Sequence, residues 1–220
     1  MRQAAARYLS QENLHQIGIA MHNYAADHDD RLPPSASRDP EGRPLLSWRV
    51  LLLPYMEEGE LYEQFHLDEP WDSPHNLALL PKMPRTYKPP PNSGFENMSD
   101  VTFYQVFTGP DTAFELATGP RLLDDFPKGT SVTILVVEAS EAVPWTKPQD
   151  LDYDPDKPLP KLGGVFTGPG RFRLLPSDRR KGAHVLLADG SARFVDASTP
   201  EHAWRWAISR TTRQPMPSEW

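Results

Sequence analysis

The chain has 220 residues, a formal net charge of −7 and no cysteine. The acidic balance argues against nucleic-acid binding, because no excess of Lys and Arg exists to neutralise phosphates. The lack of cysteine excludes disulfide scaffolds, thiolate zinc sites and cysteine nucleophiles.

Proline accounts for 25 residues, about twice its usual share of roughly 5%. We therefore expect one domain, 1–220, with short elements and long proline-rich loops. We expect no membrane span in it, because no run of about 18 apolar residues occurs.

The first segment, residues 1–30, is predicted to contain one long helix. No proline interrupts residues 2–28, and good helix formers are frequent there. At 1.5 Å per residue the helix would be roughly 40 Å long. An apolar stripe recurs at steps of three and four residues and ends in His28. The residues of this predicted packing face are Leu14, Ile17, Met21 and Tyr24. A helix of this length needs a partner surface, so we expect it to lie across a sheet.

Residues 31–100 are predicted to form short helices and loops. Ser47 is placed to cap a helix that begins at Trp48. Ser73 with Pro74 combines an N-cap with proline at the first helical position. Between them, residues 57–65 are expected to form another short helix. The many prolines in this region keep each helix brief.

Strand signals begin only after residue 100. An antiparallel sheet is predicted within 101–197, with an inserted loop at 139–170. Its strands are expected at 101–107, 130–138, 171–175, 183–188 and 191–195. Ser198, Pro200 and Glu201 resemble a capping box, which predicts a last helix at 198–210. Helices first and antiparallel strands later are typical of the α+β class.

Two features of the strand region have specific structural interpretations. Asp189 and Gly190 separate the last two predicted strands, and Asp-Gly favours the positive φ of a two-residue hairpin turn. Pro144 and Trp145 open the long loop and are expected to anchor it to the core.

The candidate metal site is the alternating run of Asp152, Asp154 and Asp156. Such carboxylates can converge on a hard cation such as calcium. An EF-hand is excluded, because Lys157 stands where glycine is needed and Gly163 where glutamate is needed. The competing interpretation is an exposed acidic turn stiffened by proline. We therefore expect no cofactor, with calcium at this loop as the open alternative.

No catalytic constellation is evident. The sequence lacks a Gly-x-Ser-x-Gly elbow, a glycine-rich phosphate loop before a helix, and a His-Glu-x-x-His zinc motif. His15 and His22 share a helix face but lack a third ligand. These observations indicate a protein that is not an enzyme. A metal-dependent hydrolase would require one of the three loop aspartates on a cation with a histidine nearby.

Several stretches resemble a large bacterial family of unknown function, whose members are pseudopilin-like and which is also labelled solute-binding protein family 10. They are residues 10–24, 32–34, 45–55, 69–76 and 143–164. Members of that family usually begin with a prepilin-type cleavage and methylation signal. The resemblance implies that the first helix is the second half of a pilin-type helix and that the fold is pilin-like. It implies no reaction.

The hallmark of that family, a His followed after nine residues by Asp-Gly, is only half present. Asp189 and Gly190 are in place, but Arg179 occupies the expected His position. His184 lies five residues before Asp189, within a predicted strand. The role of the family's His is therefore not carried over to this chain.

Two hypotheses about function remain open at this point. The first is a non-enzymatic, structural pseudopilin-like protein of the cell envelope or of a filament, with protein partners or self-assembly through the N-terminal helix. The second is a binding module for a small solute, glycan or peptide, which would use a pocket lined by two or more of the six Trp residues.

The resemblance places the protein in the cell envelope or outside the cell, with a membrane-inserting segment preceding this helix in the native gene. If Met1 is the native start, a cytoplasmic protein is expected instead, since no signal peptide is visible.

Overall fold

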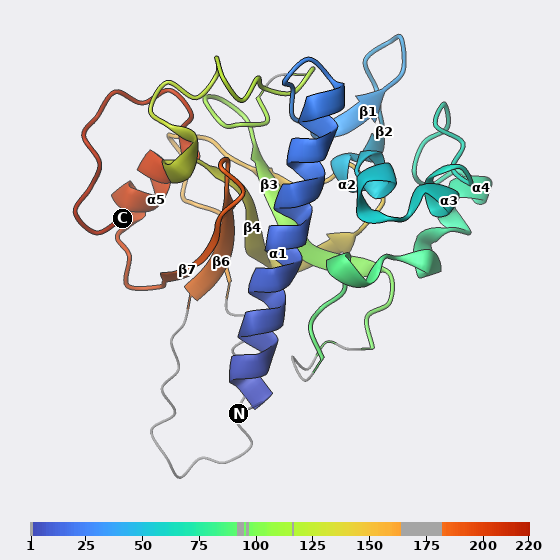
Figure 1. The fold of residues 1–220 in the computed structure, drawn as a ribbon, viewed down its shortest axis with the longest axis horizontal. Coiled ribbons are helices and arrows are strands. Elements are labelled where there is room, and N and C mark those ends of the chain that lie inside the picture. Colours follow the sequence, from blue (N-terminus) through green and yellow to red (C-terminus); the bar gives the residue numbers. More distant parts are fainter. Residues whose placement is uncertain (1, 92–94, 96, 116, 164–181) are drawn as a thin grey trace.

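The computed structural model describes residues 2–91, 95, 97–115, 117–163 and 182–220. The predicted strand at 171–175 and Arg179 therefore lie outside the described residues. Helix α1 (Arg2–Asp27) runs across one face of a five-stranded sheet, and helix α5 (Glu201–Ile208) packs on the opposite face (Figure 1). The prediction of an α+β fold with a long N-terminal helix packed on a sheet is confirmed.

The sheet has the strand order β5-β3-β4-β6-β7. Its strands are β3 (Val101–Thr108), β4 (Ile134–Pro144), β5 (Leu151–Asp152), β6 (Gly182–Leu187) and β7 (Ala192–Asp196). All neighbours pair antiparallel except the short edge strand β5, which is parallel to β3. Just before β5, the Asp150 side chain accepts a hydrogen bond from the backbone N–H of Val106, which fastens the loop along β3.

Successive residues of the central strands pack into two different hydrophobic cores, one on each face of the sheet. Val136 and Leu186 pack on the α1 side, whereas their neighbours Val137 and Val185 pack on the α5 side. This alternation follows from the two-residue period of a β-strand. On α1 itself, the predicted packing residues Leu14, Ile17 and Met21 are fully buried, and Tyr24 is partly buried against the same core.

Helix α1 approaches the sheet closely at Gly18. A Cβ atom at this position would lie 2.8 Å from Cδ1 of Leu186 and 3.2 Å from the carbonyl oxygen of Gly190. Glycine is therefore needed here for close approach, although it lowers the intrinsic stability of a helix.

The segment between α1 and the sheet is built from short elements. They are β1 (Ala36–Arg38), β2 (Pro44–Ser47), α2 (Trp48–Leu51), the 3₁₀ turn η1 (Leu53–Met56), α3 (Gly59–Tyr62), α4 (Pro74–Leu77), η2 (Leu80–Lys82) and η3 (Arg85–Tyr87). Ser47 and Ser73 cap α2 and α4 as predicted, each accepting a backbone N–H. Helix α3 is shorter than the predicted 57–65, and α4 ends before Pro81.

Three boundaries differ from the prediction. Strand β4 begins after a 3₁₀ turn, η4 (Thr130–Val132), and continues to Pro144, because β3 pairs with it along that length. Helix α5 begins at Glu201 without a side-chain cap, because the Ser198 hydroxyl bonds Asp196 instead. The turn between β6 and β7 has three residues, not two, with Gly190 at φ 85° closing it as a bulge.

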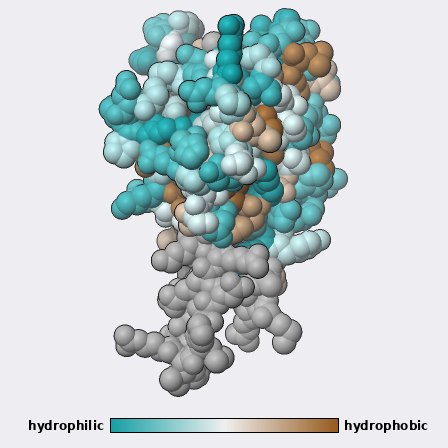
Figure 2. Space-filling model, turned by 90° about the vertical axis from the view of Figure 1, so that its left-hand side faces the viewer, coloured by the Kyte–Doolittle hydropathy of each residue, from teal (hydrophilic) through white to brown (hydrophobic). Residues whose placement is uncertain are grey.

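The surface around α5 and the C-terminal segment is mostly hydrophilic, with small separate hydrophobic patches (Figure 2). Among the described residues, no helix combines the length and the apolar character needed to cross a membrane.

Candidate functional site

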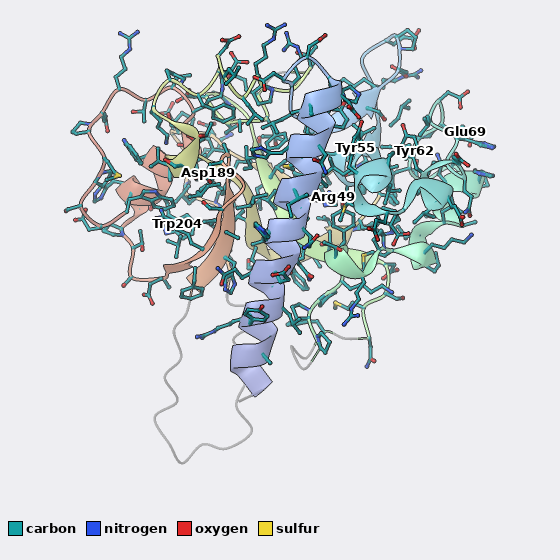
Figure 3. The ribbon with its side chains drawn as sticks, viewed as in Figure 1. Arg49, Tyr55, Tyr62, Glu69, Asp189 and Trp204 are labelled. Carbon is teal, nitrogen blue, oxygen red and sulfur yellow. The ribbon has the colours of Figure 1, made fainter. Side chains whose placement is uncertain are left out.

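A cleft of about 840 Å³ lies between α1 and the turn η1. One wall comes from the outer side of α1 and the other from the residues that follow α2, with Tyr55 beside the helix (Figure 3). Its lining residues are Gln16, Ile19, Asn23, Ala26, Asp27, Pro54, Tyr55, Met56, Glu57 and Thr86. The volume falls within the range of about 300–1,000 Å³ that is usual for small-molecule sites.

The local sequence explains the second wall of this cleft. Pro54 lies at the start of η1, and Glu57 ends it in the left-handed conformation at φ 60°. The chain therefore turns sharply, and Tyr55 faces α1. Its ring meets that of Tyr24 edge to face, with centroids 5.6 Å apart, and Tyr24 in turn stacks on His28 at 3.8 Å.

The cleft is electrostatically negative. Burial raises the pKa of the Tyr55 phenol, and the nearby Asp27 carboxylate, which accepts a hydrogen bond from that phenol, raises it further. Neither Asp27 nor Glu57 forms an ion pair within the described part of the chain, and the described lining contains no Lys or Arg. An anionic ligand would be repelled here, whereas a cation would be attracted.

Helix α1 also contacts the hairpin that contains Asp189 and Gly190, through His15 and His22. A ring nitrogen of His22 lies 3.0 Å from the carbonyl oxygen of Ala188, and one of His15 lies 3.3 Å from that of Gly190. The Asp189 carboxylate accepts bonds from the Ser191 N–H and hydroxyl, at 2.9 and 2.6 Å. Asp189 and Gly190 therefore shape the turn, and the two histidines fix it to α1.

A buried polar network joins the first part of α1 to the sheet. The Ser10 hydroxyl donates to the Glu138 carboxylate and accepts from the Tyr104 hydroxyl at 2.9 Å. The same carboxylate binds the ring and the backbone N–H of His184, at 3.0 and 2.9 Å. The order is not that of a nucleophilic triad, because the serine bonds the carboxylate and not the imidazole. The network is suited to anchoring the helix.

The aspartates of the long loop do not converge. Asp154 accepts from the backbone N–H of Asp156 at 2.9 Å and pairs with Lys157 at 3.0 Å. These contacts, the Asp156 hydrogen bond first, lower the pKa of Asp154. Asp152 lies exposed in β5. Among the residues described, no three His, Cys, Asp or Glu side chains come together in a way that would hold a metal ion.

Of the two predicted loop anchors, Trp145 packs into the core and Pro144 is half-buried. Trp145 is fully buried, and its indole N–H donates to the carbonyl oxygen of Leu80 at 2.8 Å. Pro144 ends β4 opposite Val101. Of the six Trp residues, Trp48, Trp145, Trp204 and Trp206 are buried, whereas Trp71 and Trp220 are partly buried. The cleft beside α1 is lined by Tyr55 and by no Trp.

Sequence reasoning missed the cleft residues Asp27, Tyr55 and Glu57. A local signal was present in the sequence Pro-Tyr-Met-Glu at 54–57, which follows an apolar run with an aromatic and an acid. Nothing in the sequence indicated that this turn meets the end of the first helix.

A long N-terminal helix, a largely antiparallel sheet and a cleft beside the helix define an α+β domain. The family model with the name SBP_bac_10, described as "Protein of unknown function (DUF1559)", matches residues 1–113. The chain belongs to this family. No curated protein and no solved structure matches it.

Proposed function

We propose that this protein is a non-enzymatic, pseudopilin-like subunit of an assembly in the cell envelope, and that it contacts its partners through the outward face of α1. Membership in the family supports this assignment, as does the packing of a long N-terminal helix against an antiparallel sheet. The partners are other copies of the chain or related subunits.

The observation that carries the proposal is the lack of charge along the second half of α1, before Asp27. Residues 13–26 contain no Asp, Glu, Lys or Arg, although the helix has a solvent-facing side. Ile19 is 42% exposed on that side, and Gln16 and Asn23 lie exposed beside it. A solvent-facing helix side is ordinarily charged. An uncharged face with exposed apolar residues is typical of a protein contact.

The absence of native cysteine allows a direct test by disulfide cross-linking. Gln16→Cys and Asn23→Cys are introduced singly into the full native gene product, which is expressed in its own host and oxidised in isolated envelopes. Cross-linked species are expected from both variants. Leu123→Cys is the matched control, because Leu123 is 86% exposed and lies outside α1.

Equal cross-linking at position 123, or none at 16 and 23, would overturn the proposed contact face. Recovery of the native protein in the soluble cytoplasmic fraction would overturn the envelope location.

A second candidate function is a binding module for a small solute. The observation that favours it is the cleft between α1 and η1, and the family model's SBP name agrees with such a role. A rise in melting temperature with particular solutes is expected, because a ligand that binds only the folded state stabilises it. A solute library that leaves the melting temperature unchanged would count against this function.

A further inference from the structure

We propose that the cleft between α1 and η1 binds an organic cation, namely an ammonium or guanidinium group carried on a short apolar body. This inference rests on the binding role of the cleft, whose α1 wall shares Gln16, Ile19 and Asn23 with the proposed contact face. Three properties of the lining support it: carboxylates without an ion-pair partner in the described chain, an apolar wall, and acceptors at the rim.

The charge comes from both walls of the cleft. Asp27 is at the last turn of α1, and Glu57 is at the end of η1. Both side chains belong to exposed residues, and neither has an ion-pair partner within the described chain. Carboxylates on opposite walls can approach one ammonium group from two sides. Their attraction is moderate at a wet surface, about 1 kcal/mol for unit charges 4 Å apart in water.

The apolar wall fits the body of such a ligand. Tyr55 and Met56 are partly buried, and Ile19 lies opposite them on α1 with 42% of its surface exposed. A phenol ring attracts a cation over its face, and a thioether adapts to irregular ligands. The Met56 sulfur is held by the Tyr87 hydroxyl at 3.1 Å, so this part of the wall is ordered by a buried partner.

The rim supplies acceptors for N–H groups. Gln16 lines the cleft, and its amide nitrogen donates to Glu12 at 3.0 Å, so its amide oxygen remains to accept a hydrogen bond. Asn23, one turn beyond Ile19, and Thr86 from η3 complete the rim. Hydrogen-bond acceptors, carboxylates and an aromatic face together favour an alkylammonium over a neutral or anionic solute of equal size.

The first experiment compares three ligands of the same length: pentylamine, 1-pentanol and pentanoate. The protein carries ¹³C-labelled methionine methyl groups, and their NMR signals are followed during titration. Pentylamine is expected to shift the Met56 signal in a saturable way, whereas the alcohol and the carboxylate leave it in place. The Met21 signal is an internal control, because Met21 is fully buried on the sheet-facing side of α1.

Variants on each wall test the role of charge, and the Glu57 variant does so without changing the outward face of α1. Glu57→Gln should weaken pentylamine binding about fivefold, as expected for loss of one nearby charge. Asp27→Asn should do the same. Glu63→Gln, at an exposed site of the following turn, is the matched control and should bind as the parent does. Circular dichroism verifies folding of each variant.

Two results would overturn the inference: equal binding of pentylamine and pentanol, or unchanged affinity in both Glu57→Gln and Asp27→Asn. Loss of binding in Glu57→Gln with cross-linking at position 16 retained would separate the cleft from the assembly face. The same titration with acetyl-lysine amide identifies the source of the cation. Tighter binding than pentylamine indicates a basic peptide side chain, and weaker binding indicates a free amine.

Discussion

Arg49 and Asp150 form an ion pair inside the protein, with 2.6 Å between Nη2 and Oδ1 and side chains 0% and 2% exposed. The same carboxylate accepts from the indole N–H of Trp48 at 3.2 Å and from the backbone N–H of Val106 at 2.9 Å. The guanidinium also donates to the carbonyl oxygen of Tyr104 at 2.7 Å. The pair therefore joins α2, β3 and the long loop at one buried point.

Replacing Asp150 with alanine should destabilise the protein by about 3–5 kcal/mol, because the buried Arg49 charge would lose its partner. The measurement is a urea titration followed by tryptophan fluorescence. Glu41→Ala is the control: Glu41 pairs with Arg43 at 3.3 Å, with side chains 67% and 75% exposed, and its loss should leave the midpoint nearly unchanged. Equal midpoints for the two variants would contradict the buried pair.

Ser10→Ala should destabilise the protein by about 1–3 kcal/mol, because the Glu138 carboxylate, only 3% exposed, would lose a hydrogen-bond donor. Hydrogen exchange should show faster opening of the first turns of α1, since Ser10 links this part of the helix to β4. Ser218→Ala, at the exposed C-terminal end, is the control. A parent-like urea midpoint for Ser10→Ala would show that the network does not anchor the helix.

Gly18→Ala should lower stability by about 1–3 kcal/mol through crowding against Leu186, despite alanine's better helix propensity. The matched control is Gly59→Ala at the start of α3, where a Cβ atom would have no neighbour within 4 Å. That change should be neutral or slightly stabilising. Thermal unfolding of both variants decides the matter, and a Gly18 variant as stable as the Gly59 variant would refute the close approach.

The parts of the fold that could be predicted are those with local causes. The proline-free run at 2–28 and the prolines that follow it predict α1. Ser47 and Ser73 predict the starts of α2 and α4, because each caps its helix locally. The hairpin at Asp189 was located correctly, but its length was not, since a residue added to a turn leaves the Asp-Gly signal unchanged.

The parts that could not be predicted join residues far apart in sequence. Arg49 and Asp150 are separated by 101 positions, and the only local sign of their pairing was a charge within the apolar run 48–53. The cleft has the same origin, because Asp27 and Tyr55 meet only after α1 is placed on the sheet. The alternation of Asp152, Asp154 and Asp156 was visible, but Lys157 pairs with Asp154 and the three carboxylates do not converge.

Lys128 should make stability depend on pH in the alkaline range. Its ammonium group lies 4.1 Å from the ring centroid of Trp206 and donates to the Trp206 carbonyl in the last turn of α5. Burial lowers its pKa from 10.5 to about 7, against an opposing effect of Asp111. Between about pH 7 and pH 10.5 the unfolded chain thus binds a proton at this site that the folded chain releases.

Because the unfolded state binds more protons in that window, this group makes the free energy of unfolding increase as pH rises from 7 to 10. At neutral pH and below, the unfavourable burial of the charge is fully present. Urea titrations of the parent and of Lys128→Met should therefore diverge with pH, the parent gaining stability relative to the variant. Lys161→Met, at an exposed position, is the control for loss of a lysine. A constant difference between the parent and Lys128→Met from pH 7 to 10 would show that Lys128 keeps its charge in the folded protein.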